Sequence, residues 1–359
     1  MNARPDSSLA LAVNARYRAH AITGQQRYAH EIVSRLQPYL CPIEPEQPLA
    51  GLRGHAWEQL VLPRKLHGRL LWSPCQSGPM FLRNHVVTFH DLFPVDNPEW
   101  FSRKMALWYS ALLPRLAKNS RILIAVSEFT KQRIVERFRI PPEKIAVIYN
   151  GVGHEFQPQP PTALDRLRQA VSLPTNKYLL TVGSLEPRKN LARLLTAWND
   201  IQGDLPPDYW LVVAGMKGKA SVFARDGGRL TGHRVCFAGY VEQDLLPALY
   251  AGARALLHPA IAEGFGLPLL EAMACGTPSL AAKTSSMPEV TGGIALFVDP
   301  LNTQEMARGI RDLVSSDALR DDLSRRGLQW APRFNWETAA AQTLDLLQNV
   351  ALSRSSRQR

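Results

Sequence analysis

Residues 258–271 read HPAIAEGFGLPLLE, and this stretch decides the fold that we expect for the 359-residue chain. A short apolar run of the kind found in buried strands ends at His258, and a loop with two glycines follows it. A helix is expected to begin near Leu267, because Pro268 suits the first turn of a helix. Strand, glycine loop and helix in this order favour an α/β domain whose loop and helix N-terminus bind a phosphate group.

Two carboxylates lie eight residues apart in this stretch, Glu263 in the loop and Glu271 in the expected helix. Carboxylates repel phosphate, but they accept hydrogen bonds from sugar hydroxyls. A ligand that combines phosphate with sugar would explain the glycine loop and the carboxylates together. The alternative is a plain helix cap in which Glu271 complements the helix dipole.

The remaining chain alternates between short β-rich runs and amphipathic helical patterns. The expected strands are Leu9–Val13, Val86–Phe89, Ile122–Val126 and Ile145–Tyr149 in the first half, and Tyr178–Val182, Trp210–Ala214, Val235–Ala238, Ala255–His258 and Leu296–Val298 in the second. Helices are expected between them, for example over Gln25–Leu36, Phe129–Phe138 and Leu191–Ile201. This alternation predicts an α/β protein with parallel sheets covered by helices on both faces.

A proline-rich stretch, Phe156–Pro161, is expected to separate two domains, because its prolines cannot join a central strand. We therefore expect Rossmann-like domains over residues 1–158 and 159–334, followed by residues 335–359, whose last part is expected to be disordered. Ligands of such sheets bind beyond the carboxyl ends of the strands. A ligand is accordingly expected in a cleft between two domains that face each other.

Composition excludes several classes of protein. Hydrophobic residues make up 45% of the chain and charged residues 20%, which excludes a disordered chain. We find no run of about 18 apolar residues, as a transmembrane helix needs, and the N-terminal apolar run is too short for a signal peptide. The four isolated cysteines (Cys41, Cys75, Cys236 and Cys275) indicate reduced thiols and no zinc site. We therefore expect a cytoplasmic protein.

The net charge of +11 lies almost wholly in the first half of the chain. Residues 1–150 hold 20 Lys and Arg against 11 Asp and Glu, whereas residues 151–359 hold 22 against 20. Between Trp100 and Ser127, five basic residues accompany aromatic and aliphatic ones, with no acidic residue. Such a face suits an anionic lipid surface or a phosphate-bearing substrate, and a core helix with a solvated basic edge explains it equally well. Nucleic acid is not expected as a partner, because the sequence contains no recognised binding module or regular basic repeat.

Several motifs in a fixed order resemble one enzyme family. Residues 264–278 read GFGLPLLEAMACGTP, and Pro288-Glu289-Val290 and Gly292-Gly293 follow. Together with the pair of glutamates, these closely resemble the GT4 family of retaining glycosyltransferases (glycosyl transferases group 1), over a span from Gly24 to about Trp336. The resemblance implies the GT-B fold, in which two Rossmann-like domains face across a donor and acceptor cleft. It also implies that a C-terminal helix crosses back onto the N-terminal, acceptor-binding domain.

The resemblance implies a nucleotide-sugar site in the C-terminal domain. Glu263 would contact the hydroxyls of the donor sugar and Glu271 the ribose. The backbone amides that would reach the donor sugar and diphosphate are those of Gly264, Phe265, Gly266 and Leu267.

The resemblance also implies a diphosphate clamp in the turn that reads TVGSLEPRKNL over residues 181–191 and contains Gly183. Many relatives have arginine where this chain has Ser184, so Arg188 is expected to supply the guanidinium beside Lys189, as in the branch whose motif reads GxLEPRKN. Two adjacent cations suit the charge that develops on a departing nucleoside diphosphate. An exposed basic helix start is the alternative.

Two further matches lie in the N-terminal half. The stretch TGQQRY over residues 23–28 resembles the family's glycine loop, so Gly24 is expected beside the donor phosphate and the acceptor pocket. Phe89-His90-Asp91-Leu92 matches the family's active-site histidine motif, which implies that His90 contacts the donor sugar or the reacting centre. A lone histidine at a strand end otherwise has a structural role.

We therefore expect a metal-independent retaining glycosyltransferase with no cofactor, whose nucleotide sugar is a substrate. The sequence has no Asp-x-Asp motif to hold a metal ion, so Arg188, Lys189 and helix N-termini would stabilise the leaving diphosphate. We find no well-placed carboxylate nucleophile, so the acceptor is expected to attack from the face on which the diphosphate leaves.

The PRKN branch favours GDP-mannose as the donor, in bacterial lipopolysaccharide or exopolysaccharide synthesis. The acceptor is then expected to be a glycan or a polyprenyl-diphosphate-linked sugar, and the basic N-terminal domain is expected to contact the anionic inner membrane peripherally. Other donors (UDP-glucose, UDP-GlcNAc or dTDP-rhamnose), a nucleotide-sugar epimerase, a glycan phosphorylase and a non-catalytic nucleotide-sugar-binding protein stay open as alternatives. A phosphorylase is disfavoured, because it would need a pyridoxal-phosphate lysine and a much longer chain.

Overall fold

The computed structural model describes residues 11–20, 22–49, 51–215 and 232–355. The chain divides into two compact units, which are described separately below. The first unit holds residues up to Gly151 together with the segment from Phe334 onward, and the second runs from Val152 to Arg333.

The first unit is built on a parallel sheet of six strands within the described residues, in the order β2-β1-β3-β4-β5-β6. The strands are β1 (Leu11–Asn14), β2 (Leu40–Ile43), β3 (Leu70–Ser73), β4 (His85–Phe89), β5 (Ile122–Ala125) and β6 (Ile145–Val147). Its helices are α1 (Gly24–Arg35), α2 (Gly51–Leu60), α3 (Phe93–Asp96), α4 (Arg103–Asn119), α5 (Glu128–Phe138) and α13 (Trp336–Ser355).

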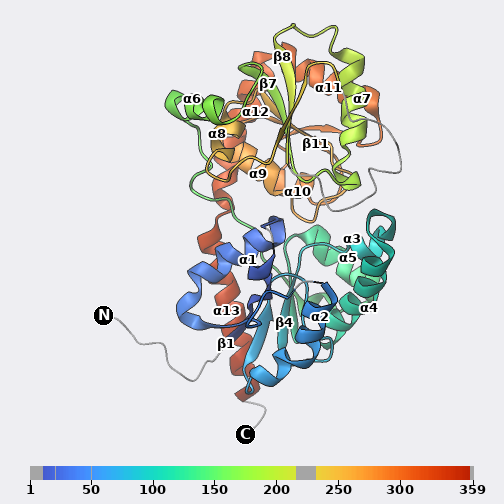
Figure 1. Ribbon diagram of the computed structural model, residues 1–359, viewed down its shortest axis with the longest axis vertical. Helices are drawn as coiled ribbons and strands as arrows, with labels where there is room; N and C mark the ends of the chain where they lie inside the picture. Colours follow the sequence, from blue (N-terminus) through green and yellow to red (C-terminus); the bar gives the residue numbers. More distant parts are fainter. Residues whose placement is uncertain (1–10, 21, 50, 216–231, 356–359) are drawn as a thin grey trace. The chain divides into compact units, whose positions relative to one another are not determined.

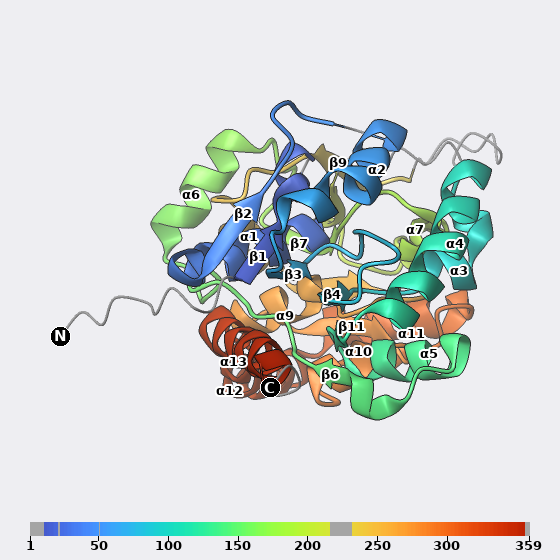
Figure 2. The same cartoon turned by 90° about the horizontal axis from the view of Figure 1, so that it is seen from below.

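Helices cover both faces of this sheet, with α1 and α13 on one side and α2, α4 and α5 on the other (Figure 2). On the first side, the buried ring of Tyr28 in α1 contacts the rings of Trp72 and Trp336 at centroid distances of 6.5 and 6.2 Å. On the second side, three leucines of α4 pack against Val87 and Phe89 of β4. The alternation of side chains along each strand thus gives the sheet two apolar faces.

The second unit is built on a second parallel sheet, again of six strands among the described residues, in the order β12-β11-β10-β7-β8-β9. The strands are β7 (Lys177–Val182), β8 (Tyr209–Ala214), β9 (Val235–Gly239), β10 (Ala255–His258), β11 (Ser279–Ala282) and β12 (Leu296–Val298). Its helices are α6 (Pro161–Ala170), α7 (Leu191–Ile201), α8 (Leu246–Ala251), α9 (Leu267–Ala274), α10 (Met287–Thr291), α11 (Thr303–Ser315) and α12 (Asp317–Trp330). Figure 1 shows α7 and α11 on one face of this sheet and α8, α9 and α12 on the other.

The sequence predictions of parallel α/β sheets and of the three helices named are confirmed, with ends that differ by a residue or two. Leu9 and Ala10 of the first expected strand lie outside the described residues. Three strands were not predicted: β2, β3 and β11. The strand β2 contains Pro42 and lies at the edge of its sheet, where a proline is tolerated.

The first boundary between the units lies after Gly151, before the position expected after Pro158. Phe156 explains the difference, because it is buried in the core of the second unit and its ring lies 6.0 Å from that of Tyr250. The second boundary precedes Phe334, so α13 belongs to the first unit and packs against α1. Among the described residues, we find no helix that is long and apolar enough to cross a membrane.

Candidate functional site

The loop between β10 and α9 has the conformation that its glycines permit. Gly266 caps α9 with φ 102° and ψ 45°, a left-handed conformation that side chains with a Cβ rarely adopt. The helix begins at Leu267 with Pro268 in its first turn, as the sequence predicts. The hydroxyl of Ser286 lies 2.9 and 2.8 Å from the carbonyl oxygens of Glu263 and Phe265, which share its proton as acceptors. This contact fixes the conformation of the loop.

The carboxylate of Glu263 is the centre of a buried ionic cluster. It accepts hydrogen bonds from Arg188 Nη1 at 2.8 Å, from His258 Nε2 at 3.1 Å and from Lys189 Nζ. Glu263 is only 6% exposed. Arg188 also pairs with Glu186, at 2.9 Å. The described partners thus form a cluster of two cations and two carboxylates whose charges balance.

Both cations of this cluster lie in the turn Pro187–Lys189, which joins β7 to α7. The next residue, Asn190, has a left-handed backbone (φ 63°), and its amide donates hydrogen bonds to the carbonyls of Pro259 and Pro300 at 2.9 and 2.6 Å. The N–H of Ile261 donates to the carbonyl of Arg188 at 2.7 Å. The two loops are therefore fixed to each other through main chain and side chains.

The electrostatics of the cluster keep Glu263 ionised. Burial on its own would raise its pKa, but Lys189, Arg188 and the hydrogen bond from His258 hold the pKa of this carboxyl well below its usual range. Burial lowers the pKa of His258, so its imidazole is neutral and donates through Nε2. Burial also lowers the pKa of Lys189, and the nearby Glu263 opposes that shift.

Glu271 has a different environment from that of Glu263. It is buried on α9, and its Oε2 accepts a hydrogen bond from the hydroxyl of Tyr250 at 2.7 Å. Tyr250 lies on α8 in the core of the second unit. The hydroxyl of Tyr250 on α8 thus orients the carboxylate of Glu271. The sequence analysis did not identify this tyrosine as a partner.

Gly183 follows β7 with φ 148°, and its N–H donates to the carbonyl of Ala214 at 3.0 Å. A Cβ on Gly183 would lie 3.3 Å from Cε of Lys189, so glycine leaves room for the lysine side chain to pass. The neighbouring turn is tighter still, since a Cβ on Gly215 would overlap the carbonyl of Gly183. The glycines of this turn and the β10–α9 loop therefore bring Arg188, Lys189 and Glu263 together.

His90 lies in the first unit, immediately after β4, and is 6% exposed. Its Nε2 donates to the carbonyl of Pro74 at 2.7 Å, and its ring packs edge-on against Tyr28 at 4.9 Å between centroids. Burial lowers the pKa of His90 to about 4, even though the Pro74 carbonyl favours the protonated form. The imidazole is therefore neutral at pH 7, with Nδ1 as its acceptor atom.

Gly24 is the first residue of α1, and a Cβ built on it meets nothing within 4 Å. No described part of the chain lies so close to Gly24 that a side chain at this position would be excluded. In the part of the chain that the structure describes, no three His, Cys, Asp or Glu side chains are grouped so as to hold a metal ion.

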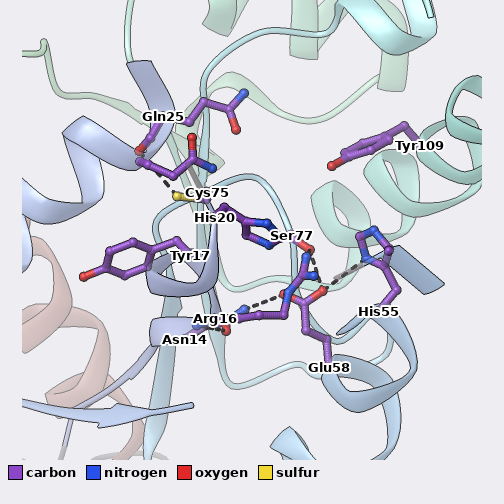
Figure 3. A pocket seen from close by; sticks show the side chains of 12 residues that line it. Asn14, Arg16, Tyr17, His20, Gln25, His55, Glu58, Cys75, Ser77 and Tyr109 are labelled. Carbon is purple, nitrogen blue, oxygen red and sulfur yellow. Dashed lines mark hydrogen bonds and ion pairs between the residues drawn. The ribbon is translucent and has the colours of Figure 1, made fainter. Parts of the chain in front are cut away.

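The first unit also contains a cavity of about 200 Å³ that sequence reasoning missed (Figure 3). At its base, Arg16 Nε lies 3.0 Å from the carboxylate of Glu58. The signal in the sequence was the pair Asn14, the last residue of β1, and Arg16, which follows the strand at the carboxyl edge of the sheet, where ligands bind. Glu58 carries no such signal, because it lies inside α2.

Comparison with known proteins gives matches over most of the chain. The model of the family Glycosyl transferases group 1 matches residues 165–330, and that of Glycosyltransferase Family 4 matches residues 59–156. O-antigen chain mannosyltransferase B of Escherichia coli is 31% identical over 276 residues, which cover 75% of this chain and 72% of that protein. Serotype-specific mannosyltransferase WbdA of Escherichia coli is 28% identical over 264 residues, 71% of this chain, and the chain spans 32% of its length.

Solved structures share the fold. The crystal structure of HepE of Anabaena in complex with UDP-glucose has a TM-score of 0.72 at 19% identity, and the match covers 94% of this chain and 99% of that chain.

Proposed function

Because this chain belongs to the GT4 family of glycosyltransferases, with the GT-B fold and O-antigen mannosyltransferases among its relatives, we propose that it transfers mannose from GDP-mannose with retention of configuration. The proposed acceptor is a glycan or a polyprenyl-diphosphate-linked sugar of a bacterial surface polysaccharide. The second unit binds the nucleotide sugar and the first unit binds the acceptor.

The cluster around Glu263 carries this proposal. It combines a carboxylate, which accepts hydrogen bonds from sugar hydroxyls, with Arg188 and Lys189, which suit a diphosphate. A bound diphosphate would compete with Glu263 for the two cations, since its oxygens are equally good acceptors. That exchange would release lone pairs of Glu263 to the hydroxyls of the donor sugar.

The chemical step follows from the same groups. As the bond from the anomeric carbon to the diphosphate breaks, negative charge grows on the leaving phosphate, and Arg188 and Lys189 stabilise it. The acceptor hydroxyl bonds to the same face of the sugar, and its proton passes to the leaving phosphate. Two positioned cations supply the stabilisation that a metal ion supplies elsewhere, so the proposed reaction is metal-independent.

The remaining predicted residues take supporting roles in this proposal. His90, which is neutral, accepts a hydrogen bond from a hydroxyl of the donor sugar through Nδ1 and is not a general acid. Glu271 binds the ribose. The amides at Gly264–Leu267 and the turn at Gly183 hold the sugar and the diphosphate, and Gly24 lies beside the phosphate.

We also propose a peripheral contact between the first unit and the anionic cytoplasmic face of the inner membrane. The helix α4 supports it, because Leu107 and Met105 are 73% and 41% exposed beside Arg103 and Lys104. Exposed apolar side chains next to basic ones are typical of surfaces that bind anionic lipids.

Calorimetric titration with GDP, UDP and dTDP tests the donor, first with EDTA and then with magnesium. The proposal expects GDP to bind without metal and to bind weakly, if measurably, after Arg188→Ala. Tighter binding of UDP than of GDP would reassign the donor. Binding of every nucleotide only with magnesium would contradict the clamp.

Turnover assays separate the alternatives. A transferase consumes GDP-mannose only when an acceptor is present, apart from slow hydrolysis. An epimerase would convert the nucleotide sugar without acceptor, and a non-catalytic binding protein would bind it unchanged.

A further inference from the structure

A buried glutamine holds the carboxyl end of β4. Oε1 of Gln76, in the loop between β3 and β4, accepts hydrogen bonds from the backbone N–H groups of His90 and Asp91, at 2.7 and 3.1 Å. The N–H of Gln76 itself donates to the carbonyl of Thr88 at 3.1 Å. Gln76 is only 2% exposed, so these hydrogen bonds are shielded from water. One residue thus joins its loop to the chain on both sides of Phe89.

The same loop holds the ring of His90. Two residues before Gln76, the carbonyl of Pro74 accepts the hydrogen bond from Nε2 of His90 at 2.7 Å. The backbone and the ring of His90 are therefore both bound to the segment 74–76. The partner of one ring nitrogen decides which nitrogen carries the proton. A displaced segment 74–76 would accordingly change the orientation of the ring and the state of Nδ1.

The backbone of Gln76 indicates what its side chain contributes. Its conformation is left-handed (φ 50°), which is uncommon for residues other than glycine and which asparagine adopts more readily than glutamine. Glycine has no side chain that could accept the two N–H groups, and the side chain of asparagine is one methylene shorter. The reach of the amide oxygen, and not the preference of the backbone, therefore explains glutamine at this position.

The carbonyl side of His90 is held from a different element. Oγ1 of Thr130 in α5 donates to the carbonyl of His90 at 3.3 Å and accepts a hydrogen bond from Oγ of Ser127 at 3.0 Å. The helix and the loop thus hold His90 at separate atoms. Removing the amide oxygen of Gln76 would release the N–H and the ring of His90 while α5 still holds its carbonyl.

We propose that Gln76 is a positioning residue for the transfer reaction, which fixes the orientation and the tautomer of His90 so that Nδ1 is presented as a hydrogen-bond acceptor. The inference rests on the proposed function for the part that His90 takes in the reaction. That Gln76 fixes His90 comes from the contacts of Gln76 alone.

Kinetics of Gln76 variants of the full chain test the proposal. Gln76→Met removes the acceptor at a similar volume, and we expect kcat for GDP-mannose to fall about tenfold or more, as for the loss of an oriented hydrogen bond. GDP should bind as in the wild type, because the second unit binds the nucleotide in the proposed function. Gln76→Glu keeps an acceptor oxygen at the same reach and should retain most of the turnover.

Gln59→Met is the matched control. In the wild type, Gln59 of α2 donates to the carbonyl of Gly78 at 2.8 Å and accepts from the N–H of Met80 at 2.9 Å. It therefore holds the same loop by two hydrogen bonds, at a part of the loop beyond the segment 74–76. This variant should turn over GDP-mannose like the wild type.

Long-range proton–nitrogen NMR spectra of the histidine rings at pH 7 give a readout that a general loss of stability would not produce. The wild type should show a ring protonated at Nε2 whose signals are absent from His90→Gln. In Gln76→Met this ring is expected to average between its two tautomers, and in Gln59→Met it should keep the wild-type signals.

Circular dichroism shows whether each variant is folded. Gln76→Asn keeps the test informative if Gln76→Met does not fold, because asparagine suits the left-handed backbone but its oxygen does not reach. Unchanged turnover or unchanged ring signals in the folded variant, an equal loss in Gln59→Met, or an equal loss in Gln76→Glu would each overturn the proposal. Absence of turnover in the wild type would instead contradict the proposed function, and the ring signals of the ligand-free protein would still test whether Gln76 fixes His90.

Discussion

Nη1 of Arg188 lies 2.8 Å from Oε2 of Glu263, although 75 residues separate them in the sequence. The contact joins the turn after β7 to the loop after β10, two neighbouring strands of the second sheet. The carboxyl ends of neighbouring parallel strands lie at the same edge, so residues far apart in sequence meet there. The group that suits a sugar and the groups that suit a diphosphate are therefore physically coupled.

Glu263→Gln tests this coupling. The amide keeps the size of the side chain but leaves Lys189 and Arg188 without their shared carboxylate, so we expect roughly 3 kcal/mol lower free energy of unfolding. Turnover of GDP-mannose should fall by about 10²-fold or more, with GDP binding retained, because the cations stay in place. Denaturant unfolding and steady-state kinetics measure the two effects. Glu186→Gln, at a more exposed carboxylate, is the control and should cost less than about 1 kcal/mol.

His90 gives a pH-dependent prediction. Its pKa is lowered by burial from 6.5 to about 4, so the unfolded chain binds a proton more readily than the folded one between these values. Its neutral form therefore contributes full stability above about pH 6.5, and this contribution is lost as the pH falls towards 4, by roughly 3 kcal/mol in all.

His90→Gln isolates this contribution, since glutamine can donate to Pro74 without titrating. Measured by denaturant unfolding at pH 7, 5.5 and 4, the wild type should lose more stability than the variant, even though His85, with a pKa lowered to about 3, titrates in both. An equal loss in both proteins would show that His90 is not buried in its neutral form. Turnover should also be insensitive to any titration of His90 between pH 6 and 8, because an imidazole with a pKa of about 4 stays neutral throughout this range.

The sequence was sufficient for most of the fold because buried parallel strands are continuous apolar runs. It failed at β11, whose Ala281 and Ala282 are too small to give a β signal, and at β2, where Pro42 argues against a strand. In the site, motifs located Glu263, Arg188 and Lys189, but not their partner His258. His258 ends β10 only five residues before Glu263, and its part in the cluster depends on how the loop folds back onto the end of the strand, which the motifs do not record.

The cavity of the first unit was also hard to predict. Asn14 ends β1 and Arg16 follows it, at the edge of the sheet where ligands bind, whereas Glu58 lies 44 residues after Asn14 in a helix of ordinary composition. Which of several glutamates neutralises a buried arginine is decided by tertiary packing. The sequence likewise gives no reason for a glycine at position 54. The structure does, because a Cβ on Gly54 would overlap Nη1 of Arg16.

The pair of Arg16 and Glu58 predicts strong coupling between two substitutions. Glu58→Gln leaves a buried guanidinium without its counter-ion, and we expect about 3–5 kcal/mol lower stability. Arg16→Met alone leaves the carboxylate uncompensated and should cost a similar amount. The double variant removes both charges and should lose clearly less than the sum of the two, which a double-mutant cycle measures. Additive losses would mean that the two side chains act independently.

The basic helix α4 provides the last prediction. Changing Arg103, Lys104, Arg115 and Lys118 to Ser should greatly reduce sedimentation with vesicles rich in anionic lipid, because each basic residue near such a surface contributes about 1 kcal/mol.

The interaction should weaken with salt in the wild type and change little with salt in the variant, since the exposed Leu107 and Met105 contribute an apolar component. The matched control changes four arginines of the second unit, Arg308, Arg311, Arg325 and Arg326, to Ser, and should sediment like the wild type. Equal sedimentation of the two variants, below that of the wild type, would mean that net charge and not α4 accounts for the binding. Equal sedimentation of all three proteins would mean that the basic residues of α4 do not contribute to it. If the wild type stays in the supernatant at low salt, the acceptor reaches the first unit without help from the membrane surface.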